Sequence, residues 1–504
     1  SARYASASWV DESGYFWLKG GQSADGTMSD LWRFNPDTNM WAWMGGSNQI
    51  SAPSQYGVKD VSSTTNAVGS RLAQHSFVGK DKSLWVFGGI GLDGFGSTGT
   101  LDDLWKIDFI PGIPRLDGTI ETLQNEITIA YDEAWSDQFE IQLALDNTFV
   151  TLEQNITVSD SDTLTINALQ PGTNYYYRIK GINNQGSSGF TEPISVLTLP
   201  ATPSDMYVLD GSISSESFIL NWTQVQGIAD TYNLELSRDS TFTKNESLIV
   251  GYNPKTIQDD FTDTVRALQP GKKYYARIRS FNGAGFSPYS DIVTVITQPA
   301  TPTLPVVNVT NINQFTSSIK WNKIPEILDG YGVNVAIDEA FTSPIVNFQP
   351  ALVDKLENTL EITDLAPGTN YYAQVFSYNN SGQSQPSLTI PILTLPQTPL
   401  FSGDNFVTSI TQTSAVVHWT AVPEILTGYH LEVSTDINFS SNIFMLPGYG
   451  KDNLAKVVDK TMTNDTIKNL VSGQEYFVRV RAFNASGDSP NSNIIRIETV
   501  PPAP

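Results

Sequence analysis

The residues of this chain that could take part in chemistry are few, and the largest group is a set of Asn-x-Ser/Thr triplets. In a secreted eukaryotic protein the asparagine of such a triplet can accept an N-linked glycan. The pattern occurs at Asn155, Asn221, Asn245, Asn308, Asn379, Asn438, Asn464 and Asn484. Many such triplets arise by chance in a chain rich in Asn, Ser and Thr, so these asparagines are candidate glycosylation sites.

Few residues of this chain are candidates for catalysis or for metal binding. The sequence holds no cysteine, which excludes disulfides, thiolate metal sites and cysteine nucleophiles. We expect the three histidines, His75, His418 and His430, to be ordinary strand or surface residues rather than metal ligands. No Ser-His-Asp set, phosphate-binding loop or carboxylate pair has the surroundings of a known motif. We therefore assign no catalytic, cofactor-binding or metal-binding residue and no cofactor, and we predict that the chain is not an enzyme.

Length and charge limit the classes of protein and of partner. A chain of 504 residues suggests several domains, and 40% hydrophobic residues are enough for packed cores. The net charge of −23 argues against nucleic acid as a partner, because phosphate contacts need clustered Lys and Arg. No apolar run approaches the ~20 residues of a membrane-spanning helix, so no membrane insertion is expected. The chain opens at Ser1 without a signal-peptide pattern, and we expect it to be processed or part of something larger.

The elements that would position any functional side chain are repeated. Four segments share a Leu, a turn ending in Gly, an aligned Tyr that opens an alternating strand, and a final Asn-x-x-Gly. A period of roughly 100 residues is too long for a solenoid unit and fits a β-sandwich. The aligned tyrosines are Tyr175, Tyr274, Tyr371 and Tyr476, and an earlier strand carries Trp222, Trp321 or Trp419, with Tyr131 at that place in the first copy.

These features resemble fibronectin type III domains over roughly residues 111–504. The resemblance implies that the tryptophans are core residues and that each aligned tyrosine forms a tyrosine corner, in which its hydroxyl bonds nearby backbone. It predicts sandwiches at 111–199, 200–299, 300–396 and 397–504. Departures from the pattern are Tyr131 in place of Trp and Ser472 in place of the turn proline.

The connections between the predicted sandwiches are short and marked by proline, at 197–204, 296–303 and 393–400. Proline favours extended backbone, so we expect stiff spacers and a rod on the order of 150 Å for four sandwiches. The Asn-x-x-Gly segments begin at Asn183, Asn282, Asn379 and Asn484, and we interpret them as turns whose residues tolerate positive φ.

Residues 1–110 follow a different pattern. Two segments each contain an aromatic strand, a Gly-Gly pair, a polar loop and Asp-Leu-Trp; the shared residues are Gly20, Gly21 and Trp32, then Gly88, Gly89 and Trp105. This arrangement is similar to kelch repeats, the four-stranded blades of a β-propeller. The second repeat stops at Phe109 without an outer strand, and a propeller needs about four to eight blades. We therefore expect the C-terminal part of a larger propeller, with an exposed face rich in Trp and Leu that contacts a partner or another copy.

The predicted fold class is all-β, with partial kelch-type propeller blades followed by four fibronectin type III sandwiches. We expect a non-enzymatic extracellular or cell-surface protein, the stiff stalk of an adhesin or filament. Its partners would be other surface proteins, copies of itself or surface glycans. The combination resembles large secreted surface proteins of Bacteroidota. Two alternatives remain: a subunit of a self-assembling fibre, such as a pilus-like or flagellar-hair sheath, and the spacer region of a secreted carbohydrate-active enzyme.

Overall fold

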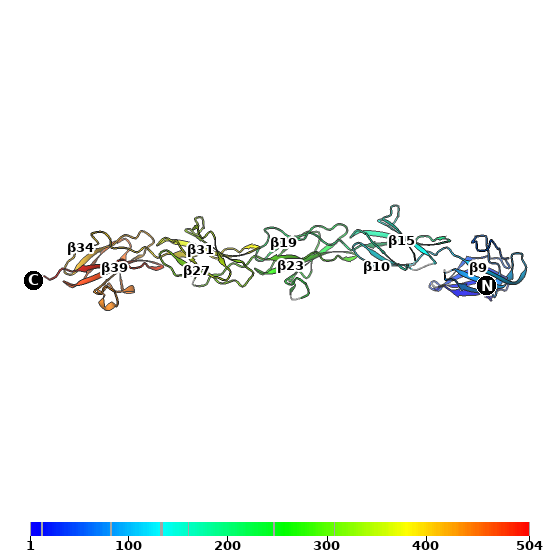
Figure 1. Ribbon diagram of the computed structural model, residues 1–504, viewed down its shortest axis with the longest axis horizontal. Helices are drawn as coiled ribbons and strands as arrows, with labels where there is room; N and C mark the ends of the chain where they lie inside the picture. The colour runs from blue at the N-terminus through cyan, green and yellow to red at the C-terminus, as the bar shows by residue number, and fades with distance from the viewer. Residues whose placement is uncertain are drawn as a thin grey trace.

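The protein is an elongated row of β-structured units (Figure 1). The computed structural model describes residues 2–11, 14–80, 83–131, 135–159, 161–244, 247–306 and 308–502. A pair of small sheets lies at one end of the row and the C-terminus at the other (Figure 1). Within these ranges no helix has the length and apolar character needed to cross a membrane.

Two antiparallel sheets form the N-terminal unit. The first has the strand order β1-β3-β4-β5, with β2 also paired to β3; the second has the order β6-β8-β7, with β9 also paired to β8. Their bounds are β1 (Arg3–Tyr4), β2 (Ala7–Val10), β3 (Phe16–Ser23), β4 (Gly26–Asn35), β5 (Met40–Gly45), β6 (Arg71–Leu72), β7 (His75–Val78), β8 (Leu84–Leu92) and β9 (Thr98–Ile107). The described strands do not close into a ring, so the larger propeller stays a prediction.

The two N-terminal sheets stack face to face because each buries every second side chain of its strands. Trp17 and Leu31 of the first sheet and Leu84 and Val86 of the second form the shared core. The sheets are also built alike. In the first, Asp30 accepts hydrogen bonds from Arg3 at 2.6 Å and from the Trp32 indole at 2.7 Å. The corresponding residues of the second sheet are Asp103, Arg71 and Trp105, with both distances 2.6 Å.

Four β-sandwiches of one topology follow, each a three-stranded sheet facing a five-stranded sheet. In the first, the orders are β10-β11-β14 and β13-β12-β15-β16, with β17 also on β15. Its strands are β10 (Leu116–Thr122), β11 (Ile127–Tyr131), β12 (Gln138–Ala144), β13 (Gln154–Ser159), β14 (Thr163–Ile166), β15 (Asn174–Asn183), β16 (Gly186–Ser187) and β17 (Ile194–Leu197).

The second and third sandwiches repeat this order. The second contains β18 (Tyr207–Val208), β19 (Phe218–Asn221), β20 (Thr231–Ser237), β21 (Lys255–Ile257), β22 (Thr262–Val265), β23 (Lys273–Asn282), β24 (Gly285–Phe286) and β25 (Val293–Ile296). The third contains β26 (Val309–Thr310), β27 (Ser317–Lys320), β28 (Gly330–Ala336), β29 (Ala351–Asp354), β30 (Thr359–Ile362), β31 (Asn370–Asn379), β32 (Gly382–Gln383) and β33 (Ile390–Leu393).

The fourth sandwich adds two short 3₁₀ turns to the same order. It contains β34 (Val407–Thr408), β35 (Ser414–His418), β36 (Gly428–Ser434), η2 (Asn442–Phe444), η3 (Asp452–Leu454), β37 (Lys456–Asp459), β38 (Asn464–Lys468), β39 (Glu475–Asn484), β40 (Gly487–Asp488) and β41 (Ile495–Glu498). In each sandwich one loop projects from the side of the rod. It points one way in the first and third sandwiches and the opposite way in the second and fourth (Figure 1).

The core of each sandwich lies between its two sheets and contains the aromatic residues singled out in the sequence. Trp321, for example, is fully buried, and its ring centroid lies 5.4 Å from that of Tyr331. In the first sandwich Tyr131 and Phe139 form the corresponding pair, with centroids 4.8 Å apart. The smaller Tyr is therefore accommodated by an aromatic partner at closer range. Trp222 and Trp419 are buried at 4% and 5% exposure.

The aligned tyrosines tie the turn that precedes them to the long strand that they open. The hydroxyl of Tyr175 accepts a hydrogen bond from the backbone N–H of Gln170 at 2.9 Å. The same bond joins Gln269 to Tyr274 at 2.8 Å, Ala366 to Tyr371 at 2.8 Å and Val471 to Tyr476 at 2.9 Å. The bond in the last copy forms although Ser472 replaces the turn proline, because the donor is the residue before that position.

Candidate functional site: interdomain joints and aromatic faces

The asparagine that ends the long strand of each sandwich reaches back to the unit before it. Asn282, the last residue of β23, donates from its side-chain amide to the carbonyl of Thr198 at 3.0 Å and to that of Ile228 at 3.1 Å. Its side-chain oxygen accepts from the N–H of Ala284 at 2.9 Å. The segment is therefore a turn, and its asparagine also bonds the backbone of the preceding sandwich.

The threonine on the other side of the joint is tied into its own domain. Thr198 is completely buried, and its hydroxyl donates to the carbonyl of Gln170 at 2.8 Å. The same hydroxyl accepts from the N–H of Thr173 at 2.9 Å. Because Gln170 also bonds Tyr175, the tyrosine turn of one sandwich is connected through Thr198 to Asn282 of the next.

Backbone hydrogen bonds complete the joint between the first two sandwiches. The N–H of Ile228 donates to the carbonyl of Gly172 at 2.7 Å, and the N–H of Gly172 donates to Leu199 at 2.9 Å. Gly172 has a φ of +56°, and a Cβ there would lie 2.7 Å from the nitrogen of Ile228. Glycine is thus needed at this position both for its backbone conformation and for the close approach of the neighbouring sandwich.

The joint is repeated along the row. At the second joint Asn379 bonds the carbonyls of Thr297 and Ile327 at 2.9 and 3.1 Å, and at the third Asn484 bonds those of Thr394 and Ile425 at 2.8 and 3.4 Å. The corresponding backbone bonds run from Ile327 to Gly271 at 3.1 Å and from Ile425 to Gly368 at 3.0 Å. Asn183 bonds Phe109 at 2.7 Å and Trp135 at 3.1 Å, so the N-terminal sheets are attached to the first sandwich in the same manner.

Further side chains hold the proline-marked connections. In the third sandwich Gln314 donates to the carbonyl of Pro396 at 2.9 Å and lies 3.2 Å from the hydroxyl of Thr398. Gln124 makes the equivalent contacts with Pro200 and Thr202. The connections are therefore clamped along their length rather than left as free tethers.

The histidines do not come together. His75 is exposed on β7, whereas His418 and His430 lie on β35 and β36, which belong to different sheets of the last sandwich. The ring of His418 lies 2.9 Å from the Thr408 hydroxyl, and that of His430 lies 2.8 Å from Asp488. In the part of the chain that the structure describes, no group of three or more His, Asp or Glu side chains could hold a metal ion.

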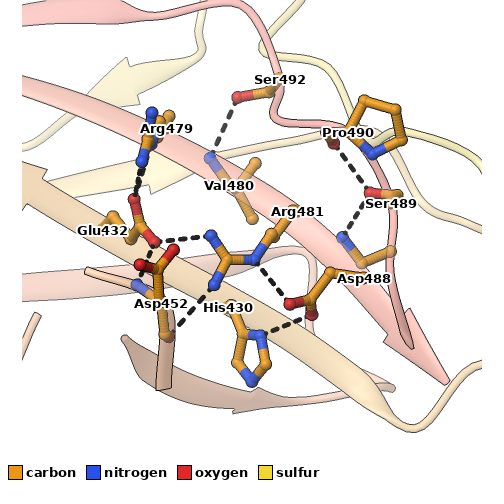
Figure 2. A network of polar contacts seen from close by, with 11 residues as sticks. His430, Glu432, Asp452, Arg479, Val480, Arg481, Asp488, Ser489, Pro490 and Ser492 are labelled. Carbon is orange, nitrogen blue, oxygen red and sulfur yellow. Dashed lines mark hydrogen bonds and ion pairs between the residues drawn. The ribbon is translucent and has the colours of Figure 1, made fainter. Parts of the chain in front are cut away.

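A buried charge network lies on the five-stranded sheet of the last sandwich (Figure 2). Glu432, whose side chain is 1% exposed, pairs with Arg479 and Arg481, both at 2.6 Å. Arg481 continues to Asp488 at 3.1 Å and to the backbone carbonyl of Asp452 at 3.1 Å. Both charges of each pair are thus compensated within the sheet, which gives the network a structural role.

The outer faces of the N-terminal sheets carry exposed apolar side chains. On the first sheet Val10, Phe16, Trp41 and Trp43 are between 48% and 55% exposed, and Val10, Phe16 and Trp41 line a shallow hollow. On the second sheet Phe77, Phe87 and Leu104 are 51%, 46% and 55% exposed. Exposed apolar clusters of this kind usually mark a contact surface.

One cation lies between the two N-terminal sheets. Lys19 is 2% exposed, and its ammonium donates to the carbonyl of Ser29. The pKa of Lys19 is lowered from 10.5 to about 7, first by burial and next by the positive charge of Arg71; the negative charge of Asp30 opposes both. Burial alone would raise the pKa of Asp30, but hydrogen bonds from Arg3 and Trp32 outweigh it and lower that pKa below its ordinary value.

The structure separates the described candidate glycosylation sites into three groups. Asn379 and Asn484 are 8% and 6% exposed, and their amide nitrogens are the donors at two of the joints. Asn155 and Asn438 are exposed, and Asn221, Asn308 and Asn464 are partly buried. Asn245 lies outside the described residues.

The joint residues were not recognised in the sequence as more than turn residues. A signal was present, because Asn stands at the first position of the turn in all four copies. In addition, a threonine stands two residues before a proline in each copy, at Thr198, Thr297, Thr394 and Thr499. An isolated turn would accept Asp or Gly as well. Of these three residues, only Asn has a side chain that can donate to a carbonyl and accept from the turn N–H at once.

Comparison with known proteins adds the family. The model of the Fibronectin type III domain matches residues 119–197, 201–296, 300–392 and 404–498. "Fibronectin type-III domain-containing protein 3a" of Gallus gallus is 26% identical over 360 residues, which are 67% of this chain and 28% of that protein. "Cell adhesion molecule Dscam1" of Drosophila melanogaster is 25% identical over 377 residues, 71% of this chain and 18% of that protein. The chain thus spans less than a third of the length of either relative.

The comparison with solved structures gives matches of low overall similarity. The crystal structure of chicken CNTN1 FN1-FN3 domains covers 57% of this chain and 100% of its own, at 19% identity and a TM-score of 0.24.

Proposed function

Because the chain belongs to the fibronectin type III domain family, we propose that it is a non-enzymatic, adhesion-type protein of the cell surface in which four sandwiches form a stiff stalk. The stalk would hold the N-terminal sheets at a fixed distance from the point of attachment. The partners would be other surface proteins or surface glycans.

The observation that carries this proposal is the repeated joint. At each of three sandwich junctions an asparagine amide and a backbone N–H cross from one domain to the other, as Asn379 does to Thr297 and Ile327 does to Gly271. A net hydrogen bond contributes about 1 kcal/mol, so each joint resists bending by roughly 2 kcal/mol before apolar contacts are counted. A chain that needed flexible tethers would not tie every junction in one geometry.

Composition and relatives support the surface location. A net charge of −23 keeps a long molecule soluble and does not favour nucleic acid. The curated relatives include a protein named as a cell adhesion molecule. The matching Gly-Gly and Asp-Leu-Trp positions, together with the paired Arg3–Asp30 and Arg71–Asp103 contacts, support kelch-type blades at the tip. We further propose that the protein is a surface adhesin of the Bacteroidota kind.

Small-angle X-ray scattering of the full chain tests the stalk. We expect a pair-distance distribution with a long tail, as for a rod, and a shorter mean extension when the joint asparagines are removed together in Asn282→Ala, Asn379→Ala and Asn484→Ala. The matched control is Asn155→Ala with Asn438→Ala, which changes two exposed asparagines. A compact distribution for the unaltered protein would refute the stalk, and identical curves for joint variant and control would refute the role of the joints.

Labelling intact source cells with an antibody against the chain tests the location. Staining without permeabilisation is expected. Staining that appears only after permeabilisation would rule out a surface role.

A further inference from the structure

We propose that the N-terminal sheets of different copies of this chain stack head to tail, so that the protein associates through its tip. This inference does not depend on the proposed adhesion function. It rests on a comparison of the covered and uncovered faces of the two sheets.

Each N-terminal sheet has two faces, which we name by corresponding residues. The front face contains Trp9, Trp17 and Leu31 in the first sheet and Phe77, Trp85 and Leu104 in the second. The back face contains Phe16, Leu18 and Phe34 in the first sheet and Leu84, Val86 and Ile107 in the second. The correspondence follows from the Gly-Gly pairs, since Trp17 and Trp85 each lie three residues before the first glycine.

Inside the chain, the front face of the first sheet covers the back face of the second. Trp17 and Leu31 pack with Leu84 and Val86, which are at most 3% exposed, and Trp9 and Ile107 pack at the margin. The contact joins unlike faces. It is therefore a heterologous contact in which the described residues leave the front face of the second sheet and the back face of the first uncovered.

The free front face repeats the covered one. Trp9 and Trp17 form a stacked pair with centroids 5.8 Å apart and an 11° angle between rings; Phe77 and Trp85 form a pair at 6.1 Å and 2°. Trp17 is 1% exposed beneath the second sheet, whereas Phe77 is 51% exposed. The same aromatic arrangement is thus covered in one sheet and open in the other.

The free back face repeats the covered back face in the same way. Phe16 occupies the position of Leu84, yet Phe16 is 48% exposed and Leu84 is 2% exposed. Beside Phe16, the hollow lined by Val10, Phe34 and Trp41 offers a recess for side chains of an incoming sheet.

The free front face differs from the covered one at the position of the buried cation. Phe87 lies at the position that corresponds to Lys19, and His75 lies at that of Ala7, the cross-strand neighbour of Lys19. An exposed Phe in place of the Lys favours an apolar occupant at this position.

The occupant to which we commit is a second copy of this chain. Further blades of a longer chain would fit the same faces, and such a protein would stay at the mass of one copy. The free back face of one copy corresponds to the back face that is covered within the chain. The free front face of another copy corresponds to the front face that covers it. The N-terminal unit lies at the end of the rod, so the sandwiches do not lie over its outer faces (Figure 1). If the contact repeats with constant rotation and closes at the four to eight sheets of known propellers, the ring contains about two to four copies.

Sedimentation velocity of the full chain tests the proposal, with one variant for each free face. Phe16→Asp alters the free back face and Phe87→Asp the free front face. Leu352→Asp is the matched control, since Leu352 is 68% exposed on a sandwich. The unaltered chain and the control are expected to reach about two to four times the mass of one copy at high concentration. Each face variant alone is expected to fall to the mass of one copy.

Mixing the two face variants is the decisive measurement. Phe16→Asp retains an intact front face and Phe87→Asp an intact back face, so a heterologous contact predicts dimers, and no larger species, in the equimolar mixture. Such complementation also shows that both variants are folded. The proposal is overturned if the unaltered chain stays at the mass of one copy, if only one variant loses association, or if the mixture remains at that mass.

Discussion

The side-chain amide of Asn484 donates a hydrogen bond to the main-chain carbonyl of Thr394, 2.8 Å away, although the two residues belong to different sandwiches. Thr394 is completely buried, and its hydroxyl donates to Ala366, one residue after the start of the tyrosine turn. A side chain of the fourth sandwich is therefore bonded to a residue that is itself bonded to the tyrosine turn of the third. This relationship turns a repeat of similar domains into a continuous rod.

Changing the joint glycine should disturb the arrangement of two sandwiches. In Gly172→Ala the new Cβ meets the backbone of Ile228 at 2.7 Å, so the hydrogen bond between Ile228 and Gly172 should be lost. The control Gly251→Ala has a similar φ of +86° but open space around the Cβ, and both variants bear about 1 kcal/mol of backbone strain. Hydrogen exchange at Ile228 should accelerate only in Gly172→Ala; equal acceleration in both would contradict the joint.

Removing one tyrosine hydroxyl should destabilise one sandwich. Tyr371→Phe leaves the N–H of Ala366 without the bond that it makes at 2.8 Å, at a cost of about 1–3 kcal/mol. Tyr372→Phe, at the neighbouring and less buried position of β31, is the control and should cost much less. Hydrogen exchange of the third sandwich in the full chain measures both. Equal protection in the two variants would argue against a tyrosine corner.

Neutralising Glu432 should strongly destabilise the last sandwich. Glu432→Gln leaves Arg479 and Arg481 without their buried partner, which costs about 3 kcal/mol. The control Glu475→Gln breaks an exposed pair with Arg496 and should cost under about 1 kcal/mol. Chemical denaturation, monitored by hydrogen exchange in β36 and β39, distinguishes the two variants. A loss of the same size in both would mean that the network does not stabilise the sheet.

The buried lysine predicts a pH dependence of the N-terminal unit. The pKa of Lys19 is about 7 in the folded protein and 10.5 when unfolded, so the unfolded chain binds more protons between these values. Stability of the N-terminal sheets should therefore rise as the pH increases from about 7 toward 10. Thermal midpoints followed by tryptophan fluorescence measure this rise, and Lys19→Met should abolish it. A rise of equal size in Lys19→Met would assign it to another group.

Glycosylation should follow exposure rather than motif. In a eukaryotic secretion host Asn155 and Asn438, which are exposed, should carry glycans. Asn379 and Asn484 have their amide nitrogens bonded across joints and should be left largely unmodified once the domains fold. Peptide mass spectrometry reads out each position. Full occupancy at Asn379 would contradict this expectation, because a glycan on that amide is incompatible with its hydrogen bond to Thr297.

The sequence was most informative where a pattern is local. Alternation and the aligned Tyr175 and Tyr371 predicted strands and sandwiches, because period-two burial and turn chemistry act over a few residues. The family comparison supports that result for the four sandwiches. The joints could not be predicted from spacing, since Asn282 and Thr198 lie far apart in the chain and the contact depends on how two finished domains meet.

The N-terminal unit shows the same limit. The repeated Gly-Gly and Asp-Leu-Trp segments indicated two similar sheets, and Trp-rich outer faces were expected. Nothing in the sequence marked Lys19 as buried, because it stands in an alternating strand where the corresponding residue of the second sheet is Phe87. Only the stacking of the sheets decides which face is covered.

The alternating direction of the projecting loops gives the rod two unlike sides (Figure 1). A flat surface laid along one side would meet the loops of the first and third sandwiches, and a surface on the other side those of the second and fourth. Identical joints therefore do more than fix length: they set the angular position of every domain around the long axis. Two neighbouring molecules could each display a separate row of loops to the same cell, spaced two domains apart.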